Sequence, residues 1–127
     1  MKQKGNVSML LIALIIMGSV SAYAGTSWSS FSTTVPRFNG SGYTSYQTKS
    51  ISSEDAEVDI DYVGGDYEVD IRLVSQNRNS KWERNVVDGM FFYIPNSVQA
   101  GERCRLEISN DLSTPVKVQV EGEWRSN

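Results

Sequence analysis

The segment EVDIDYVGGDYEVDI, residues 57–71, decides the expected fold. Apolar and acidic residues alternate on both sides of a Gly-Gly pair, which is the period-two pattern of half-buried β-strands. Gly64 and Gly65 suit the positive φ angles of a two-residue turn. The segment therefore predicts an antiparallel hairpin, because a one-residue slip would place apolar residues opposite acids. The predicted core-face pairs are Tyr62 with Tyr67, Ile60 with Val69, and Val58 with Ile71.

The other face of the predicted hairpin carries six carboxylates: Glu57, Asp59, Asp61, Asp66, Glu68 and Asp70. Like charges placed directly opposite each other destabilise a sheet by up to about 1 kcal/mol. One interpretation is a solvated face that discourages edge-to-edge aggregation. A second is neutralisation by a neighbouring strand that carries Arg103, Arg105 or Lys117. A third is a site for a cation or a basic partner, which makes all six acids candidate partner-binding residues.

Calcium is the cation that such a face suggests, since it takes oxygen ligands. The candidate metal ligands are Asp59, Asp61, Glu68 and Asp70. A flat strand face supplies few of the six to eight ligands that calcium needs, and no EF-hand spacing is present. We therefore expect neither a resident metal nor a cofactor.

Short alternating segments continue through the chain, separated by turn residues. No helical periodicity follows residue 24. The pattern predicts an all-β protein, a single antiparallel β-sandwich of about eight short strands, with a closed barrel as the alternative. The apolar run MFFYIP is expected to be a central strand. Besides the hairpin, the predicted strands cover residues 28–35, 44–51, 81–87, 90–95, 103–110 and 115–124.

The N-terminus has the layout of a secretory signal peptide. Lys2 and Lys4 precede an apolar run from Met9 to Met17, and AYA at residues 22–24 resembles a cleavage site. The apolar run is shorter than the roughly 18 to 20 residues of a membrane span, which argues against a retained anchor. We expect residues 1–24 to be removed, residues 25–127 to form one domain, and no stable membrane insertion to follow cleavage.

The net charge bears on the class of partner, and the cysteine content bears on disulfide formation. All fifteen acidic residues but only ten of the twelve basic residues lie in residues 25–127, so the mature chain has a net charge of −5. This balance argues against nucleic acid as a partner. Cys104 is the single cysteine, so no internal disulfide is expected. It alternates with Leu106 and Ile108, which favours a buried apolar role over a reactive thiol.

Several catalytic chemistries are missing from the sequence. The chain has no histidine, which removes catalytic Ser-His-Asp and Cys-His arrangements and nearly all zinc sites. A pair of carboxylates with glycosidase chemistry would need a deep cleft, which a small sheet protein does not suggest. We expect no enzyme activity and identify no catalytic residue.

Aromatic residues suggest either core anchors or a platform for stacking sugar rings. Trp124 lies near the end of the last predicted strand, and we expect it to be partly exposed and to be a candidate partner-binding residue. The other aromatic candidates are Trp28, Trp82, Tyr43, Tyr46 and Tyr93.

Three segments carry a resemblance: SWSSFSTTVP at residues 27–36, GERCRLEISN at residues 101–110, and VEGEW at residues 120–124. Together they resemble a group of small exported proteins of Gram-positive bacteria. The resemblance implies export and a β fold, and it carries over no functional residues.

The sequence therefore predicts a secreted, non-catalytic interaction or accessory protein at the bacterial cell surface or in the extracellular space. Its partner would be a protein, a peptide or a cell-wall polymer. The alternatives are a module that binds cell-wall polysaccharide and a secreted bacteriocin-like or toxin protein.

Overall fold

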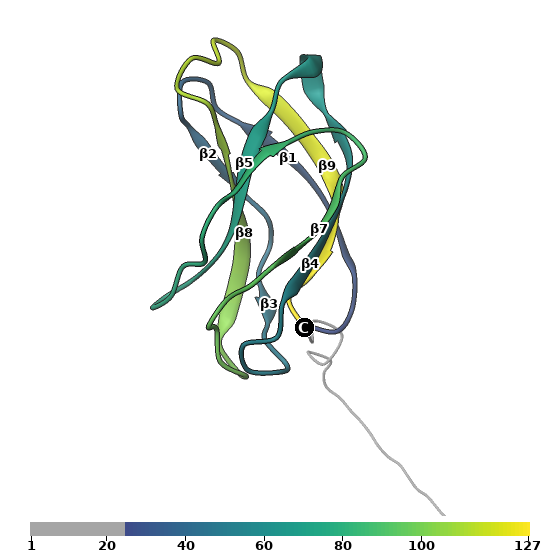
Figure 1. The fold of residues 1–127 in the computed structure, drawn as a ribbon, viewed down its shortest axis with the longest axis vertical. Helices are drawn as coiled ribbons and strands as arrows, with labels where there is room; N and C mark the ends of the chain where they lie inside the picture. Colours follow the sequence, from purple (N-terminus) through teal and green to yellow (C-terminus); the bar gives the residue numbers. More distant parts are fainter. Residues whose placement is uncertain (1–24) are drawn as a thin grey trace, which may run out of the picture.

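A computed structural model describes residues 25–127, in which two antiparallel sheets pack together as a β-sandwich (Figure 1). This confirms the predicted fold class, whereas the predicted signal peptide lies outside the described residues. Sheet 1 has the strand order β1 (Ser29–Val35), β9 (Val118–Arg125), β4 (Ala56–Val63) and β7 (Phe91–Ile94). Sheet 2 has the order β2 (Ser41–Tyr43), β8 (Arg103–Asn110), β5 (Val69–Ser75) and β6 (Glu83–Val86), and β3 (Gln47–Thr48) also pairs with β8.

The core lies between the sheets and is built from alternate residues of the long strands. Alternation puts one side of each strand inward, as the sequence predicted for β4, β5 and β8. Cys104 is free and fully buried among these side chains. The inward residues of the four longest inner strands are Val58, Ile60 and Val63; Val69, Ile71 and Leu73; Cys104, Leu106 and Ile108; and Val118, Val120 and Trp124.

The predicted hairpin of residues 57–71 does not form. β4 pairs with β9 and β7 in sheet 1, whereas β5 pairs with β8 and β6 in sheet 2. Gly64–Asp66 is a short 3₁₀ turn that carries the chain from one sheet to the other, with Gly65 at φ 65°. The crossing lets the apolar faces of β4 and β5 meet across the core, and it separates acids that a hairpin would hold opposite each other.

A register shift in β4 changes the direction of one predicted core residue. The pairing of β4 with β9 slips between Ile60 and Tyr62, so the alternation breaks there. Val63 takes the inward position, and Tyr62 is 45 % exposed instead of buried. Gly122 of β9 lies against this point, where a Cβ would clash with the backbone of Asp59 and Ile60.

Two other strand predictions need correction. β7 is an edge strand of sheet 1 and not a central one, because it pairs only with β4. Its Phe91 and Tyr93 point outward and are 48 % and 55 % exposed. The strand predicted at residues 44–51 is replaced by the two short strands β2 and β3, which both pair with β8.

Candidate functional site

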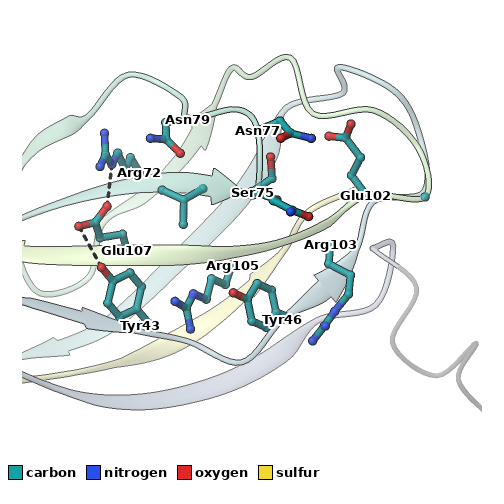
Figure 2. Close-up of a pocket in the computed structure, with 13 residues that line it drawn as sticks. Tyr43, Tyr46, Arg72, Ser75, Asn77, Asn79, Glu102, Arg103, Arg105 and Glu107 are labelled. Atoms are coloured by element: carbon teal, nitrogen blue, oxygen red, sulfur yellow. Dashed lines mark hydrogen bonds and ion pairs between the residues drawn. The ribbon is translucent and has the colours of Figure 1, made fainter.

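A groove with a volume of about 690 Å³ runs over the outer face of sheet 2 (Figure 2). It lies over β8 and β5, between Tyr43 and Tyr46 on one side and residues 75–79 on the other. Its lining residues come from four parts of the chain: Tyr43 and Tyr46; Arg72, Val74, Ser75, Gln76, Asn77 and Asn79; Gly101 and Glu102; and Arg103, Arg105 and Glu107.

Strand alternation explains why charged side chains line this groove. Cys104 and Leu106 point into the core, so Arg103, Arg105 and Glu107 all point outward from the same strand. Arg72 stands beside Glu107 because β5 and β8 place these two residues opposite each other. Successive outward residues of one strand lie about 7 Å apart, so the two arginines of β8 occupy distinct positions along the groove.

Both arginines of β8 stack on tyrosine rings. The Arg105 guanidinium lies 4.1 Å from the ring centre of Tyr43 and 4.7 Å from that of Tyr46. Arg103 lies 4.3 Å from the Tyr46 ring centre. Such contacts hold a guanidinium in place by attraction to the ring face and leave its N–H edge free to donate hydrogen bonds.

Neither stacked arginine is neutralised by a carboxylate. The four ion pairs found in residues 25–127 include neither Arg103 nor Arg105. The Nε atom of Arg105 is buried and has no hydrogen-bond partner within this same part of the chain. A buried donor without a partner costs roughly 1 to 3 kcal/mol, and no contact within the described residues offsets this cost.

Glu107 is occupied by contacts within the protein. Arg72 Nε donates to Glu107 Oε1 over 2.7 Å, and Ser41 Oγ donates to Oε2 over 2.8 Å. The Tyr43 hydroxyl donates to the same Oε2 over 3.4 Å. The Arg72 guanidinium also lies 4.4 Å from the Trp82 ring centre. Because Arg72 balances Glu107, Arg103 and Arg105 give the groove its positive charge.

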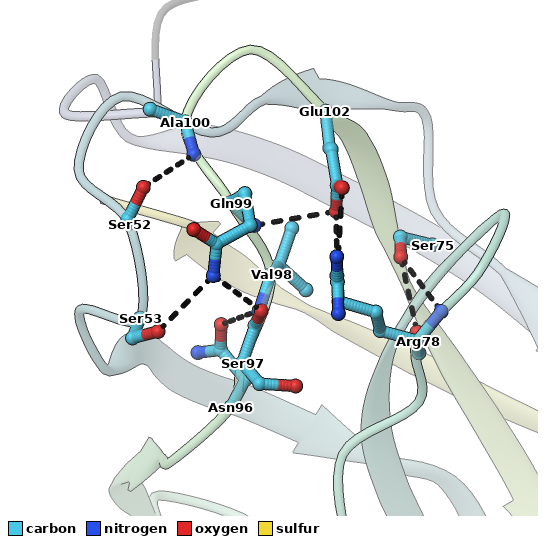
Figure 3. Close-up of polar contacts among 10 residues, drawn as sticks. All are labelled: Ser52, Ser53, Ser75, Arg78, Asn96, Ser97, Val98, Gln99, Ala100 and Glu102. Atoms are coloured by element: carbon cyan, nitrogen blue, oxygen red, sulfur yellow. Dashed lines mark hydrogen bonds and ion pairs between the residues drawn. The ribbon is translucent and has the colours of Figure 1, made fainter.

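The loop that forms one wall of the groove is held by polar contacts (Figure 3). The Ser75 N–H donates to the Arg78 carbonyl over 2.8 Å, and the Arg78 N–H donates to Ser75 Oγ over 3.2 Å. The Arg78 guanidinium pairs with Glu102 at 3.3 Å, and Glu102 also accepts from the Gln99 N–H over 3.2 Å. These contacts connect the loop to the turn before β8, and the same loop carries the neutral side chains of Gln76, Asn77 and Asn79, which line the wall.

The six acids predicted to share one face are divided between the two sheets. Glu57 accepts from the Arg125 guanidinium at 3.2 Å through both carboxylate oxygens. Asp70 accepts from Arg84 over 2.7 Å and from the Asn85 N–H over 3.1 Å. Neutralisation therefore applies to these two acids, but with other arginines than predicted. Asp59 is half-buried, and the remaining three acids are exposed: Asp61, Asp66 and Glu68.

The candidate metal ligands are separated by the same crossing. Asp59 and Asp61 belong to sheet 1, whereas Asp70 belongs to sheet 2 and pairs with Arg84. Residues 25–127 contain no group of three or more acidic, cysteine or histidine side chains arranged to hold a metal ion.

Trp124 is buried, with 1 % of its surface exposed, so its predicted exposure is wrong. It has the inward orientation of Val118 and Val120 on β9, and the alternation itself explains its burial. The predicted aromatic platform is split between two faces. Tyr43 and Tyr46 line the groove. Trp28 and Tyr93 instead lie on either side of Phe91, whose ring centre is 6.3 Å from that of Trp28 and 5.5 Å from that of Tyr93.

A second polar cluster lies inside the sandwich. The Lys49 side chain is buried, and its ammonium group donates to the carbonyl oxygens of Glu54 and Ser126. Burial lowers the pKa of Lys49 below its ordinary value and raises the pKa of the nearby Cys104 thiol. These contacts connect the segment before β4 to the residues after β9, which is a structural role.

No protein-family model, curated protein or solved structure matches this chain. No helix in the part of the chain that the structure describes is long and apolar enough to span a membrane.

Proposed function

We propose that this protein is an exported, non-catalytic interaction protein of the bacterial cell surface or extracellular space, and that the groove on sheet 2 binds an anionic partner. The observation that carries the proposal is the pair of arginines, Arg103 and Arg105, held on tyrosine rings without a carboxylate partner in residues 25–127. Arginine donors in a fixed planar arrangement suit carboxylate, phosphate and sulfate oxygens.

The charge of the whole chain makes this groove distinctive. Residues 25–127 have a net charge of −5, so most of the molecular surface repels an anion. A local positive groove on such a surface would select the orientation in which an anion approaches. The absence of histidine from the chain supports binding without catalysis.

Retention on a sulfonate cation-exchange resin tests the proposal directly. Purified residues 25–127 should be retarded at low salt near pH 7 despite their net negative charge, and added salt should remove the effect. The double variant Arg103→Gln/Arg105→Gln should pass through the resin without delay.

The matched control is Arg37→Gln/Lys81→Gln, which removes the same charge from exposed positions outside the groove. It should still be retarded. Equal elution of the two double variants, or no retardation of the unmodified protein, would show that the groove is not an anion site.

A further inference from the structure

We propose that the ligand of this groove is an acidic oligosaccharide, a glycan whose sugar units carry carboxylate or phosphate groups. The inference rests on the proposed function and adds the class of ligand. It follows from the position of the groove on its sheet, from the residue types of its two walls and from the spacing of its charges.

The position of the groove disfavours an extended acidic peptide. β8 pairs with β5 on one side and with β2 and β3 on the other, so its backbone groups are already used. A peptide could not add there as a further strand, which is how many sheets bind extended peptides. The groove lies on a sheet face, where a ligand must be held by side chains.

The lining residues also lack the apolar pockets that anchor peptide side chains. Val74 is the one aliphatic side chain among the groove residues of the described chain, and it is half-buried. Protein partners are commonly anchored by large side chains in desolvated pockets. Here the opposite wall offers side-chain amides, from Gln76, Asn77 and Asn79.

Amide side chains match the hydroxyl groups of a sugar. An amide both donates and accepts hydrogen bonds, as a hydroxyl does, so the wall can pair with several hydroxyls in different orientations. Tyr43 and Tyr46 are 43 % and 40 % exposed, and the parts of their rings that Arg103 and Arg105 do not cover can contact the C–H groups of a sugar.

The charges are arranged for a ligand with more than one anionic group. The Cα atoms of Arg103 and Arg105 lie about 7 Å apart along β8, and both guanidinium groups stack on the Tyr46 ring. A polymer with repeated anionic units can contact both guanidinium groups at once.

A series of polymers that share one backbone tests the ligand class. Binding of residues 25–127 to dextran, carboxymethyl-dextran, dextran phosphate and poly-glutamate would be measured by titration calorimetry at fixed ionic strength. We expect no binding to neutral dextran, and binding to at least one charged dextran at least tenfold tighter than to poly-glutamate. The carboxymethyl and phosphate polymers distinguish the two sources of charge.

Two variants separate glycan recognition from simple anion binding. Arg105→Gln should weaken binding of the charged dextran at least tenfold, while Arg37→Gln, outside the groove, should leave it unchanged. Asn77→Ala/Asn79→Ala should weaken binding of the charged dextran severalfold without changing retention on the sulfonate resin.

The outcomes distinguish the two proposals. Binding of poly-glutamate as tight as that of the charged dextrans, or indifference of dextran binding to the asparagine variant, overturns the glycan inference and leaves the anion site in place. Absence of binding to every polymer, together with absence of Arg103- and Arg105-dependent resin retention, overturns both.

Discussion

Cys104 shows how its surroundings decide the chemistry of one residue. It lies on the inward side of β8 and is fully buried. Burial raises the pKa of the Cys104 thiol above its ordinary value near 9.0, against the opposing effects of the Ser126 hydroxyl and the Lys49 ammonium. Thiolate is the reactive form of cysteine, so this environment makes the residue a packing element.

The raised pKa of Cys104 predicts a pH-dependent effect of Cys104→Ala. Below pH 9 the thiol is protonated in both the folded and the unfolded chain, and its stabilising effect is fully present. At higher pH the unfolded chain loses the proton first, so the folded wild type loses stability as pH rises through the folded pKa. We expect the free energy of unfolding of the variant to be about 1 kcal/mol lower than that of the wild type at pH 7. This difference in stability should be smaller at pH 10.

Urea unfolding of both proteins at the two pH values measures that gap. The comparison cancels the titrating groups that do not interact with Cys104, because both proteins contain them. A gap of the same size at pH 7 and pH 10 would show that Cys104 does not titrate on unfolding.

Inward and outward directions could be predicted from the sequence at most strand positions, because strict alternation fixes them once one residue is placed. Trp124 was predictable from its parity with Val118 and Val120, although its position near the last residues suggested exposure. Tyr62 was harder, because a bulge in β4 reverses the parity after Ile60. The one available signal for the bulge was Gly122, a glycine inside an otherwise alternating strand.

At the scale of the element, the contact between Gly122 and β4 gives a sharp test. A methyl group at Gly122 would clash with the Asp59 carbonyl oxygen and approach Ile60 Cα within 3.1 Å. Both are backbone atoms, so they cannot move away from the methyl group by a change of rotamer as side-chain atoms can. We expect Gly122→Ala to lower the free energy of unfolding by about 3 kcal/mol, the upper part of the usual range for overpacking.

Gly89→Ala is the matched control for this substitution. Gly89 has φ 77°, and nothing lies within 4 Å of the added methyl group, so the change tests backbone strain without a clash. We expect it to cost about 1 kcal/mol. Urea midpoints compare the two variants, and an equal loss of stability would mean that sheet 1 accommodates the methyl group.

Strand pairing was less predictable than strand existence. A hairpin at residues 57–71 and a crossing between sheets bury the same apolar side chains, so alternation cannot distinguish them. The structure chooses the crossing, in which β4 pairs with β9 and β5 pairs with β8. Six carboxylates around a Gly-Gly pair were a signal against direct pairing, because a hairpin would hold them opposite each other.

At the scale of the whole molecule, the crossing divides the acids between two faces, and this predicts indifference to calcium. Asp59 and Asp61 are separated from Asp70, which is paired with Arg84. A ligand that binds only the folded state raises its stability by mass action. We therefore expect the same thermal midpoint in millimolar Ca²⁺ and in chelator. A midpoint that rises with Ca²⁺ would reveal a site formed in another way.

The groove could be predicted only in part. The outward direction of Arg103 and Arg105 follows from the alternation of RCRLEI. Their contact with Tyr43 and Tyr46 depends on the pairing of β2 and β3 with β8, which lies far along the chain. The residues around Tyr43 and Tyr46 do not predict that pairing, so the groove could not be predicted without the tertiary fold.

The position of β9 has a consequence for the order of folding. β9 lies between β1 and β4 in sheet 1. Ser29, at the start of β1, pairs with Trp124, so β1 cannot join the sheet before the residues of β9 are available. Pairings between distant residues must overcome the entropy of closing a long loop, and such topologies fold in milliseconds to seconds. The centre of sheet 1 therefore cannot assemble until the chain through β9 is present. In a polypeptide that emerges in sequence order, the strands of sheet 2 are therefore all present before sheet 1 can be completed.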